Sequence, residues 1–181
     1  MADALPYGAE MNGSPWLHSE SVRPEWVDYN GHMNVAYYVL IFDHATDDAL
    51  DRLDVGEAYR RPAGCSVFVG EMHVNYRQEV VEGDALTVGT RLLATDDRRL
   101  VLFHEMTCSR FPKSVASNEV LCVHVDLATR RPAPWPAGAV ETLARWRAVH
   151  SRIPPPKLAG GSIRIAGYPV CQAGLSGVNP T

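Results

Sequence analysis

One uninterrupted helical segment limits the folds open to this chain more than any other feature. Residues 35–53 contain neither proline nor glycine, and their apolar residues recur at positions 35, 38, 39, 42, 45, 49 and 53, the spacing of one helical face. The first half, residues 35–42, is apolar on every side, which predicts that a sheet wraps around it. The second half is acidic, and we expect it to reach solvent.

Segments that alternate with a period of two follow this helix. They span residues 66–80, 84–94, 99–109 and 113–127, and turn signals separate them. With a further strand expected at residues 16–23, this order predicts an α+β fold in which one long helix packs against a five-stranded antiparallel sheet. Such a single layer leaves a sheet edge open, so we expect a homodimer or homotetramer.

Length and composition indicate one domain. The 181 residues, 46% of them hydrophobic, suffice for one core but are too few for two. We expect a flexible N-terminus over residues 1–14, a domain over residues 15–150 that ends in a surface helix at 137–150, and an extended Pro/Gly-rich tail over residues 151–181.

Charge and cysteine usage narrow the cellular setting. A net charge of −4 argues against a nucleic-acid or anionic-membrane surface. No apolar run approaches the ~20 residues that span a bilayer. The first thirty residues lack a signal-type apolar run, and the four cysteines form no CxxC pair. We therefore expect a cytoplasmic protein with free thiols and no membrane or nucleic-acid partner.

The segment Asp28-Tyr29-Asn30-Gly31-His32-Met33-Asn34, directly before the helix, carries the chemistry. Its carboxylate and imidazole lie beside the unpaired N–H groups of a helix start, which stabilise a developing oxyanion. Asp28 could act in catalysis, as a base or a nucleophile, or it could cap the helix. The local pattern leaves both roles open. Asn30 is predicted to orient water or the Asp28 carboxylate. His32 is predicted either to transfer a proton or to make a structural hydrogen bond.

This segment resembles the active-site loop of hot-dog-fold acyl-CoA and acyl-ACP thioesterases, which reads Asp-x-x-Gly-His-x-Asn before a tyrosine-bearing helix. More narrowly, VRPEWVDYNGHMNVAYYV, FVGEMHVNYRQEV, RRLVLFHEM, VHVDL and GGSIRI are similar to betainyl-CoA thioesterases of carnitine breakdown, and they run from about residue 22 to about residue 166. The resemblance implies a hot-dog fold, hydrolysis of a small acyl-CoA by Asp28 with help from Asn30 and His32, and an oxyanion at the N–H of Val35. It implies no cofactor, because CoA is part of the substrate.

A second carboxylate candidate lies on the second strand. Glu71 and His73 share one face of that strand in an otherwise apolar alternation. A glutamate on another element is catalytic in some hot-dog thioesterases, so the resemblance makes Glu71 a candidate base for this or a partner subunit. The alternative is a cross-strand ion pair with Arg77 or Arg91.

Aromatic residues gather where the resemblance places the acyl group. Ring faces hold a quaternary ammonium and an acyl chain alike, so the rings alone do not select the substrate. Core packing is the alternative for Tyr38 and Phe42. The predicted substrate-binding residues are Trp26, Tyr29, Asn34, Tyr37, Tyr38 and Tyr76.

Two charged clusters complete the candidates. Asp43, His44, Asp47 and Asp48 include i,i+4 pairs, but pairs alone do not complete a coordination sphere, so we predict no metal. Arg98-Arg99 and Arg130-Arg131 suit the CoA phosphates, and exposed charge at turns explains them equally simply.

Two other functions stay open. A hot-dog hydratase also combines Asp, Asn and His, but its motif has a proline and one more residue, whereas His32 follows Asp28 by four positions. A binding module would hold acyl-CoA without turning it over. The acyl group is also open, because Met33-Asn34-Val35 follows the general thioesterase pattern more than the betainyl branch.

Overall fold

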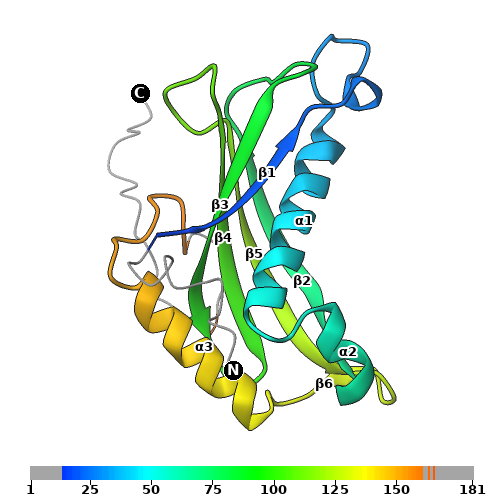
Figure 1. Cartoon of the computed structure of the whole chain (residues 1–181), viewed down its shortest axis with the longest axis vertical. Helices are drawn as coiled ribbons and strands as arrows, with labels where there is room; N and C mark the ends of the chain where they lie inside the picture. The colour runs from blue at the N-terminus through cyan, green and yellow to red at the C-terminus, as the bar shows by residue number, and fades with distance from the viewer. Residues whose placement is uncertain (1–13, 161–162, 164, 166–181) are drawn as a thin grey trace, which may run out of the picture.

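A long helix, α1 (Val35–Arg52), lies across one face of a curved antiparallel sheet (Figure 1). The structure is a computed structural model that describes residues 14–160, 163 and 165. The helix predicted over residues 35–53 is confirmed to within one residue. Its residues Ile41, Phe42 and Ala49 are fully buried against the sheet.

Five long strands form the sheet in the order β1-β3-β4-β5-β2, and all neighbouring strands are antiparallel. The chain leaves edge strand β1, crosses the sheet as α1 and returns as β2 at the opposite edge. This arrangement confirms the predicted α+β class. The strands are β1 (Trp16–Ser21), β2 (Cys65–Tyr76), β3 (Ala85–Thr95), β4 (Arg99–Cys108) and β5 (Ala116–Asp126).

Two short elements were not expected. Strand β6 (Arg131–Pro132) pairs with the end of β5, and helix α2 (Glu57–Ala63) joins α1 to β2 although it contains Pro62. The second strand also ends at Tyr76 rather than at residue 80. There the N–H groups of Arg77 and Gln78 both bond to the Val115 carbonyl, so the chain leaves the regular ladder.

The last helix, α3 (Ala137–His150), has the predicted bounds but is not simply a surface helix. Leu143, Trp146 and Val149 are buried. Trp146 also packs edge-on against Trp16 of β1, with ring centroids 5.0 Å apart. The helix therefore contributes a second part of the core.

The first half of α1 is less enclosed than predicted. Val35 is 58% exposed and Leu40 is 36% exposed, while Tyr38 and Ile41 are buried. The curved sheet covers this half of the helix as predicted, and within a single chain it leaves the side that carries Val35 and Leu40 open. The acidic second half reaches solvent as expected, for instance at Asp47.

Parts of the predicted termini lie outside the described residues: nearly all of the expected flexible N-terminus, and residues 161–162, 164 and 166–181 of the expected tail. In the described part of the tail, Ile163 and Ile165 are buried with Ala94 and Val101 of the sheet. Cys65, Cys108 and Cys122 are free thiols, and Cys171 lies outside the described residues. Over the described residues, no helix has the length and apolar character needed to span a membrane.

Candidate active site

The predicted reaction loop forms a closed turn at the N-terminal end of α1, uppermost in Figure 1. The 3-10 helix η1 (Pro24–Trp26) leads into the turn, and a backbone bridge between Val27 and Met33 closes it. Within it, the Gly31 N–H donates to the Asp28 carbonyl at 2.9 Å. Gly31 has a φ of 82°, which a side chain would strain. Asp28, Asn30 and His32 therefore share one tight turn, as the sequence predicted.

The carboxylate of Asp28 is held inside this turn. Its Oδ1 accepts a hydrogen bond from the Asn30 N–H at 2.8 Å, and its own N–H donates to the His32 carbonyl at 3.1 Å. The residue is half-buried, whereas Asn30 is exposed. The bond restrains the orientation of the carboxylate, so a main-chain donor positions this side chain.

Asn34, and not Asp28, caps α1. The Asn34 side-chain oxygen accepts from the Ala36 N–H at 2.9 Å, and its own N–H donates to the Trp26 carbonyl at 2.9 Å. The capping role considered for Asp28 is thus wrong, because Asp28 lies inside the preceding turn. Asn34 has a structural use besides the predicted substrate contact. Val35 is the first helical residue, so its N–H has no acceptor one turn earlier in the helix.

The predicted aromatic residues form two pairs beside this helix start. Trp26 and Tyr37 stack with centroids 5.3 Å apart and an interplanar angle of 17°. Tyr38 and Tyr76 meet edge-on at 5.3 Å and 86°. The Tyr76 hydroxyl donates to the Val35 carbonyl at 3.4 Å, which brings a β2 ring to the first turn of α1. Burial raises the pKa of Tyr76, so the hydroxyl keeps its proton at neutral pH.

These rings differ in how open they are. Trp26 is 4% exposed, and the Arg23 guanidinium already lies 4.8 Å from its ring centroid. Tyr38 is buried, and its hydroxyl donates to the Gln78 carbonyl at 3.2 Å. Tyr76 is 47% exposed beside the helix start, and Tyr29 is 97% exposed at the tip of the turn. Tyr76 is therefore the ring that both borders the Val35 backbone and stays open to a ligand.

Glu71 lies apart from the Asp28 turn within one chain. Met72 and Val74 of β2 pack towards the core, so the alternating residues Glu71 and His73 face away from α1. The Glu71 side chain is 46% exposed. Its described partner is His73 at 2.8 Å rather than Arg77 or Arg91. A catalytic role for Glu71 in a partner subunit stays a prediction.

The arginines considered for the CoA phosphates are already engaged at turns. Arg98 and Arg99 pair with Asp97 and Asp96, and the Arg130 guanidinium lies 5.0 Å from the Phe68 ring centroid. Sequence reasoning missed a different group of cations. A cavity of about 670 Å³ lies at the end of β2, where Arg77 follows Tyr76 in the chain. Its lining includes four cations and one carboxylate: Arg77, Arg91, Lys113, Lys157 and Glu105. Their spread over five segments hid the cluster in the sequence.

Comparison with known proteins agrees with this geometry. Residues 22–146 match the model of the thioesterase-like superfamily. The betainyl-CoA thioesterase of Pseudomonas aeruginosa is 37% identical over 151 residues, which are 82% of this chain and 91% of that protein. The L-carnitine dehydrogenase/betainyl-CoA thioesterase of Agrobacterium fabrum is also 37% identical, over 82% of this chain and 30% of that longer protein.

Solved structures resemble the whole sheet-and-helix unit. A Staphylococcus aureus protein in complex with CoA superposes with a TM-score of 0.73 at 27% identity, over 83% of this chain and 95% of that one. A proposed thioesterase of Pseudomonas putida KT2440 gives a TM-score of 0.70 at 31% identity, over 83% and 97%. These likenesses confirm the predicted hot-dog architecture.

Proposed function

Because the chain belongs to the thioesterase-like superfamily, we propose that it hydrolyses the CoA thioester of a small quaternary-ammonium acid, betainyl-CoA or a close analogue, to the free acid and CoA. The Asp28 turn carries the proposal, since it holds a carboxylate at the start of α1 in a chain 37% identical to a betainyl-CoA thioesterase. The reaction uses the CoA of the substrate and no separate cofactor.

Asp28 supplies the carboxylate for the chemical step, as base or as nucleophile. In the base route, Asp28 takes a proton from water while the water oxygen bonds to the thioester carbon. The resulting oxyanion accepts a hydrogen bond from the Val35 N–H, where the helix dipole favours negative charge. The C–S bond then breaks and the thiolate takes up the proton, either from Asp28 or through half-buried His32.

Tyr76 is the proposed contact for the acyl group. It is half exposed and lies against the Val35 carbonyl, so an acyl group whose carbonyl meets the Val35 N–H has this ring as a neighbour. A trimethylammonium over a tyrosine face gains roughly 0.5–2 kcal/mol. Tyr37, half-buried in its stack with Trp26, is the next ring along the helix.

The cation-lined cavity after β2 is the proposed seat of the CoA phosphates. Arg77 of this cavity follows Tyr76 in the chain, and strand alternation places the Tyr76 ring on the α1 face of the sheet and the Arg77 side chain on the opposite face. Arg and Lys side chains bind phosphate oxygens with charge-assisted hydrogen bonds. Glu105, 3.8 Å from Arg77, offsets only part of the positive charge there.

Release of free thiol from two matched substrates tests this function. Betainyl-CoA carries the trimethylammonium, and 3,3-dimethylbutyryl-CoA keeps its shape without the charge. We expect kcat/KM about two- to thirty-fold higher for betainyl-CoA, from the ~0.5–2 kcal/mol of a ring contact. Tyr76→Leu should remove this preference, and Tyr76→Phe should retain it because the ring remains.

Other outcomes separate the alternatives. Equal or better turnover of the neutral thioester would reject the quaternary-ammonium substrate and leave the thioesterase intact. Tight binding without thiol release from any acyl-CoA would indicate a binding module, and hydration of an enoyl-CoA would indicate a hydratase.

A further inference from the structure

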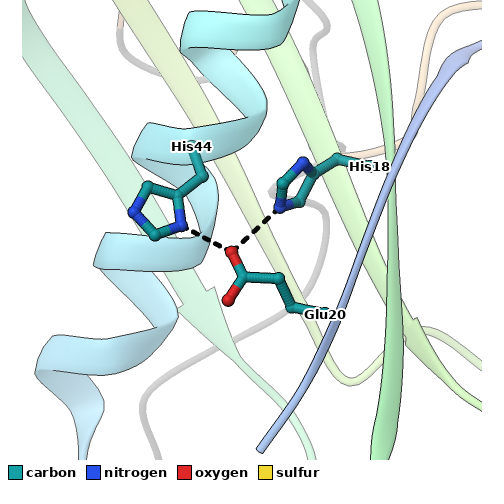
Figure 2. A group of neighbouring side chains, drawn as sticks. All are labelled: His18, Glu20 and His44. Carbon is teal, nitrogen blue, oxygen red and sulfur yellow. Dashed lines mark hydrogen bonds and ion pairs between the residues drawn. The ribbon is translucent and has the colours of Figure 1, made fainter.

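Two histidines and a glutamate converge between β1 and α1, away from the Asp28 turn (Figure 2). His18 Nε2 and His44 Nδ1 lie 3.0 Å and 2.5 Å from the same Oε1 atom of Glu20. The three ligand atoms lie within 4.8 Å of one another. The His18, Glu20 and His44 side chains are 17%, 13% and 38% exposed, so the cluster is partly buried yet reachable from solvent.

Strand alternation produces this convergence. His18 and Glu20 are two residues apart on β1 and therefore point to the same face of the sheet. Their partners on β3, Val88 and Leu86, are buried in the core beneath α1, which identifies that face as the one towards the helix. His44 points from α1 towards the Glu20 carboxylate (Figure 2).

Asp48, one turn further along α1, determines the tautomer of His18. Its Oδ2 lies 2.8 Å from His18 Nδ1, and because an ionised carboxylate only accepts hydrogen bonds, Nδ1 carries a proton. In a neutral ring, Nε2 then carries a lone pair directed at the Glu20 carboxylate. Two acceptors 3.0 Å apart need a proton or a cation between them: a second proton on His18, a proton on Glu20, or a bound cation.

Carboxylates and imidazoles surround this position: Glu20 and Asp48 lie on either side of the His18 ring, and His18 and His44 both lie against Glu20 Oε1. The second oxygen of Glu20, Oε2, is buried and accepts no hydrogen bond in the described part of the chain, with Arg23 3.9 Å away as its ion-pair partner.

We propose that His18, Glu20 and His44 bind a divalent transition-metal ion of the Zn²⁺ class, with Asp48 holding His18 in the coordinating orientation. Two imidazole nitrogens and one carboxylate oxygen are a ligand set used by zinc, with a fourth position for water, whereas Ca²⁺ and Mg²⁺ prefer oxygen ligands. A carboxylate behind a coordinating histidine is the usual supporting contact of such sites. Zinc bonds of ~2.0–2.1 Å place tetrahedral ligand atoms about 3.3 Å apart, so the ion would need the His44 and Glu20 side chains to separate from their 2.5 Å contact, while the 3.0 Å contact of His18 would change little.

The fold adds two ligands from β1 to the one histidine of the helix. The sequence predicted no metal because pairs on the helix alone do not complete a coordination sphere, and His18 and Glu20 arrive from β1. Asp43 and Asp47, the other acidic members of the helix cluster, are exposed. His44 lies about 14 Å along α1 from Val35 at ~1.5 Å per residue, so the ion would fasten the edge strand to the helix rather than act on the thioester.

Zinc titration of the untagged, chelator-treated full chain tests the site. Competition with a chromophoric zinc chelator should give one Zn²⁺ per chain. Because the ion binds the folded state, Tm should rise by about 5–10 °C at a hundredfold excess over Kd.

Glu20→Gln and His44→Gln remove one ligand each from different elements with little change in volume. Each should weaken Zn²⁺ binding by at least about tenfold and reduce the rise in Tm. His73→Gln is the matched control, because His73 also bonds to one glutamate, Glu71 at 2.8 Å, but has no second histidine in the cluster. Its zinc affinity should equal that of the wild type.

Two results would overturn the proposal. One is wild-type protein that takes up no stoichiometric Zn²⁺. The other is equal affinity in wild type and in both ligand variants, which would place the ion elsewhere. Circular dichroism of the metal-free variants verifies their fold, and His18→Gln replaces either variant that does not fold.

Discussion

At the scale of single residues, His104 is fully buried and yet keeps both ring nitrogens paired. The Thr46 hydroxyl donates to the Phe42 carbonyl at 2.9 Å, so its oxygen accepts from His104 Nε2 at 3.0 Å. Nδ1 then accepts from the Thr90 hydroxyl at 2.8 Å. Burial, with a smaller contribution from the charge of His18, lowers the pKa of His104 to about 3.

This neutral ring should make the fold sensitive to acid. Between pH 6.5 and about 3, the unfolded chain binds a proton at His104 that the folded chain does not, so stability present above pH 6.5 is lost as the pH falls. Below pH 6.5 this difference in proton binding lowers the free energy of unfolding by up to about 1.4 kcal/mol for each pH unit. Urea unfolding at pH 7.5, 6.5 and 5.5 measures how the free energy of unfolding depends on pH. This dependence should be weaker in His104→Gln than in the wild type, and an equal dependence in both would contradict the role of His104.

How far single residues could be predicted depended on their separation along the chain. Asp28, Asn30 and His32 share one turn, so their proximity was visible in the sequence. Tyr76 reaches the Val35 carbonyl from 41 residues away, and only the pairing of the strands decides that contact. The capping role of Asn34 rather than Asp28 depended on where the helix starts, which propensity locates only to within a few residues.

At the scale of elements, β2 is a long strand with one unpaired side. It has 12 residues and is the last strand in the sheet order. It carries no proline or lysine that would discourage further pairing, and Val69 is 42% exposed. Apolar Val35 and Leu40 of α1 are exposed as well. We propose that a second copy pairs along β2 and covers part of this apolar surface.

Charge placed on β2 should disrupt this assembly. The wild type should sediment as a dimer or a dimer of dimers at micromolar concentration. Val69→Asp should weaken the β2 contact about tenfold or more, since truncating or charging a central contact typically costs more than ~1 kcal/mol. Leu17→Asp on edge strand β1, 60% exposed, is the control and should not change the mass. A monomeric wild type, or dissociation by Leu17→Asp alone, would contradict pairing through β2.

The helices and strands also differed in how well the sequence predicted them. Helix α1 and the strands β3, β4 and β5 have long periodic sequences, so they were predicted to within a few residues. Helix α2 and strand β6 have seven and two residues, too few for a period to show. The exposed side of α1 at Val35 and Leu40 was not predicted, because apolar residues mark a surface to be covered without identifying what covers it.

At the scale of the whole molecule, α1 connects the two edges of the sheet and contributes to both proposed sites. Its N-terminal turn lies against Asp28 and Tyr76, and its middle faces β1 through His44. The order β1-β3-β4-β5-β2 produces both neighbourhoods, because it puts β1 and β2 on opposite edges with the helix between them. The alternation of the strands predicted a sheet, but strand order needed the three-dimensional structure.

Turnover of betainyl-CoA by Asp28→Asn tests the central proposal most directly. The amide keeps the shape of the carboxylate and its hydrogen bond to the Asn30 N–H, but it cannot take a proton from water or attack the thioester. We expect kcat to fall by about 10²–10⁴-fold, with CoA affinity and Tm close to wild type. Asp43→Asn, an exposed carboxylate on α1, should keep wild-type kcat. An Asp28→Asn enzyme that retains more than about a tenth of wild-type kcat would contradict the catalytic role of the turn.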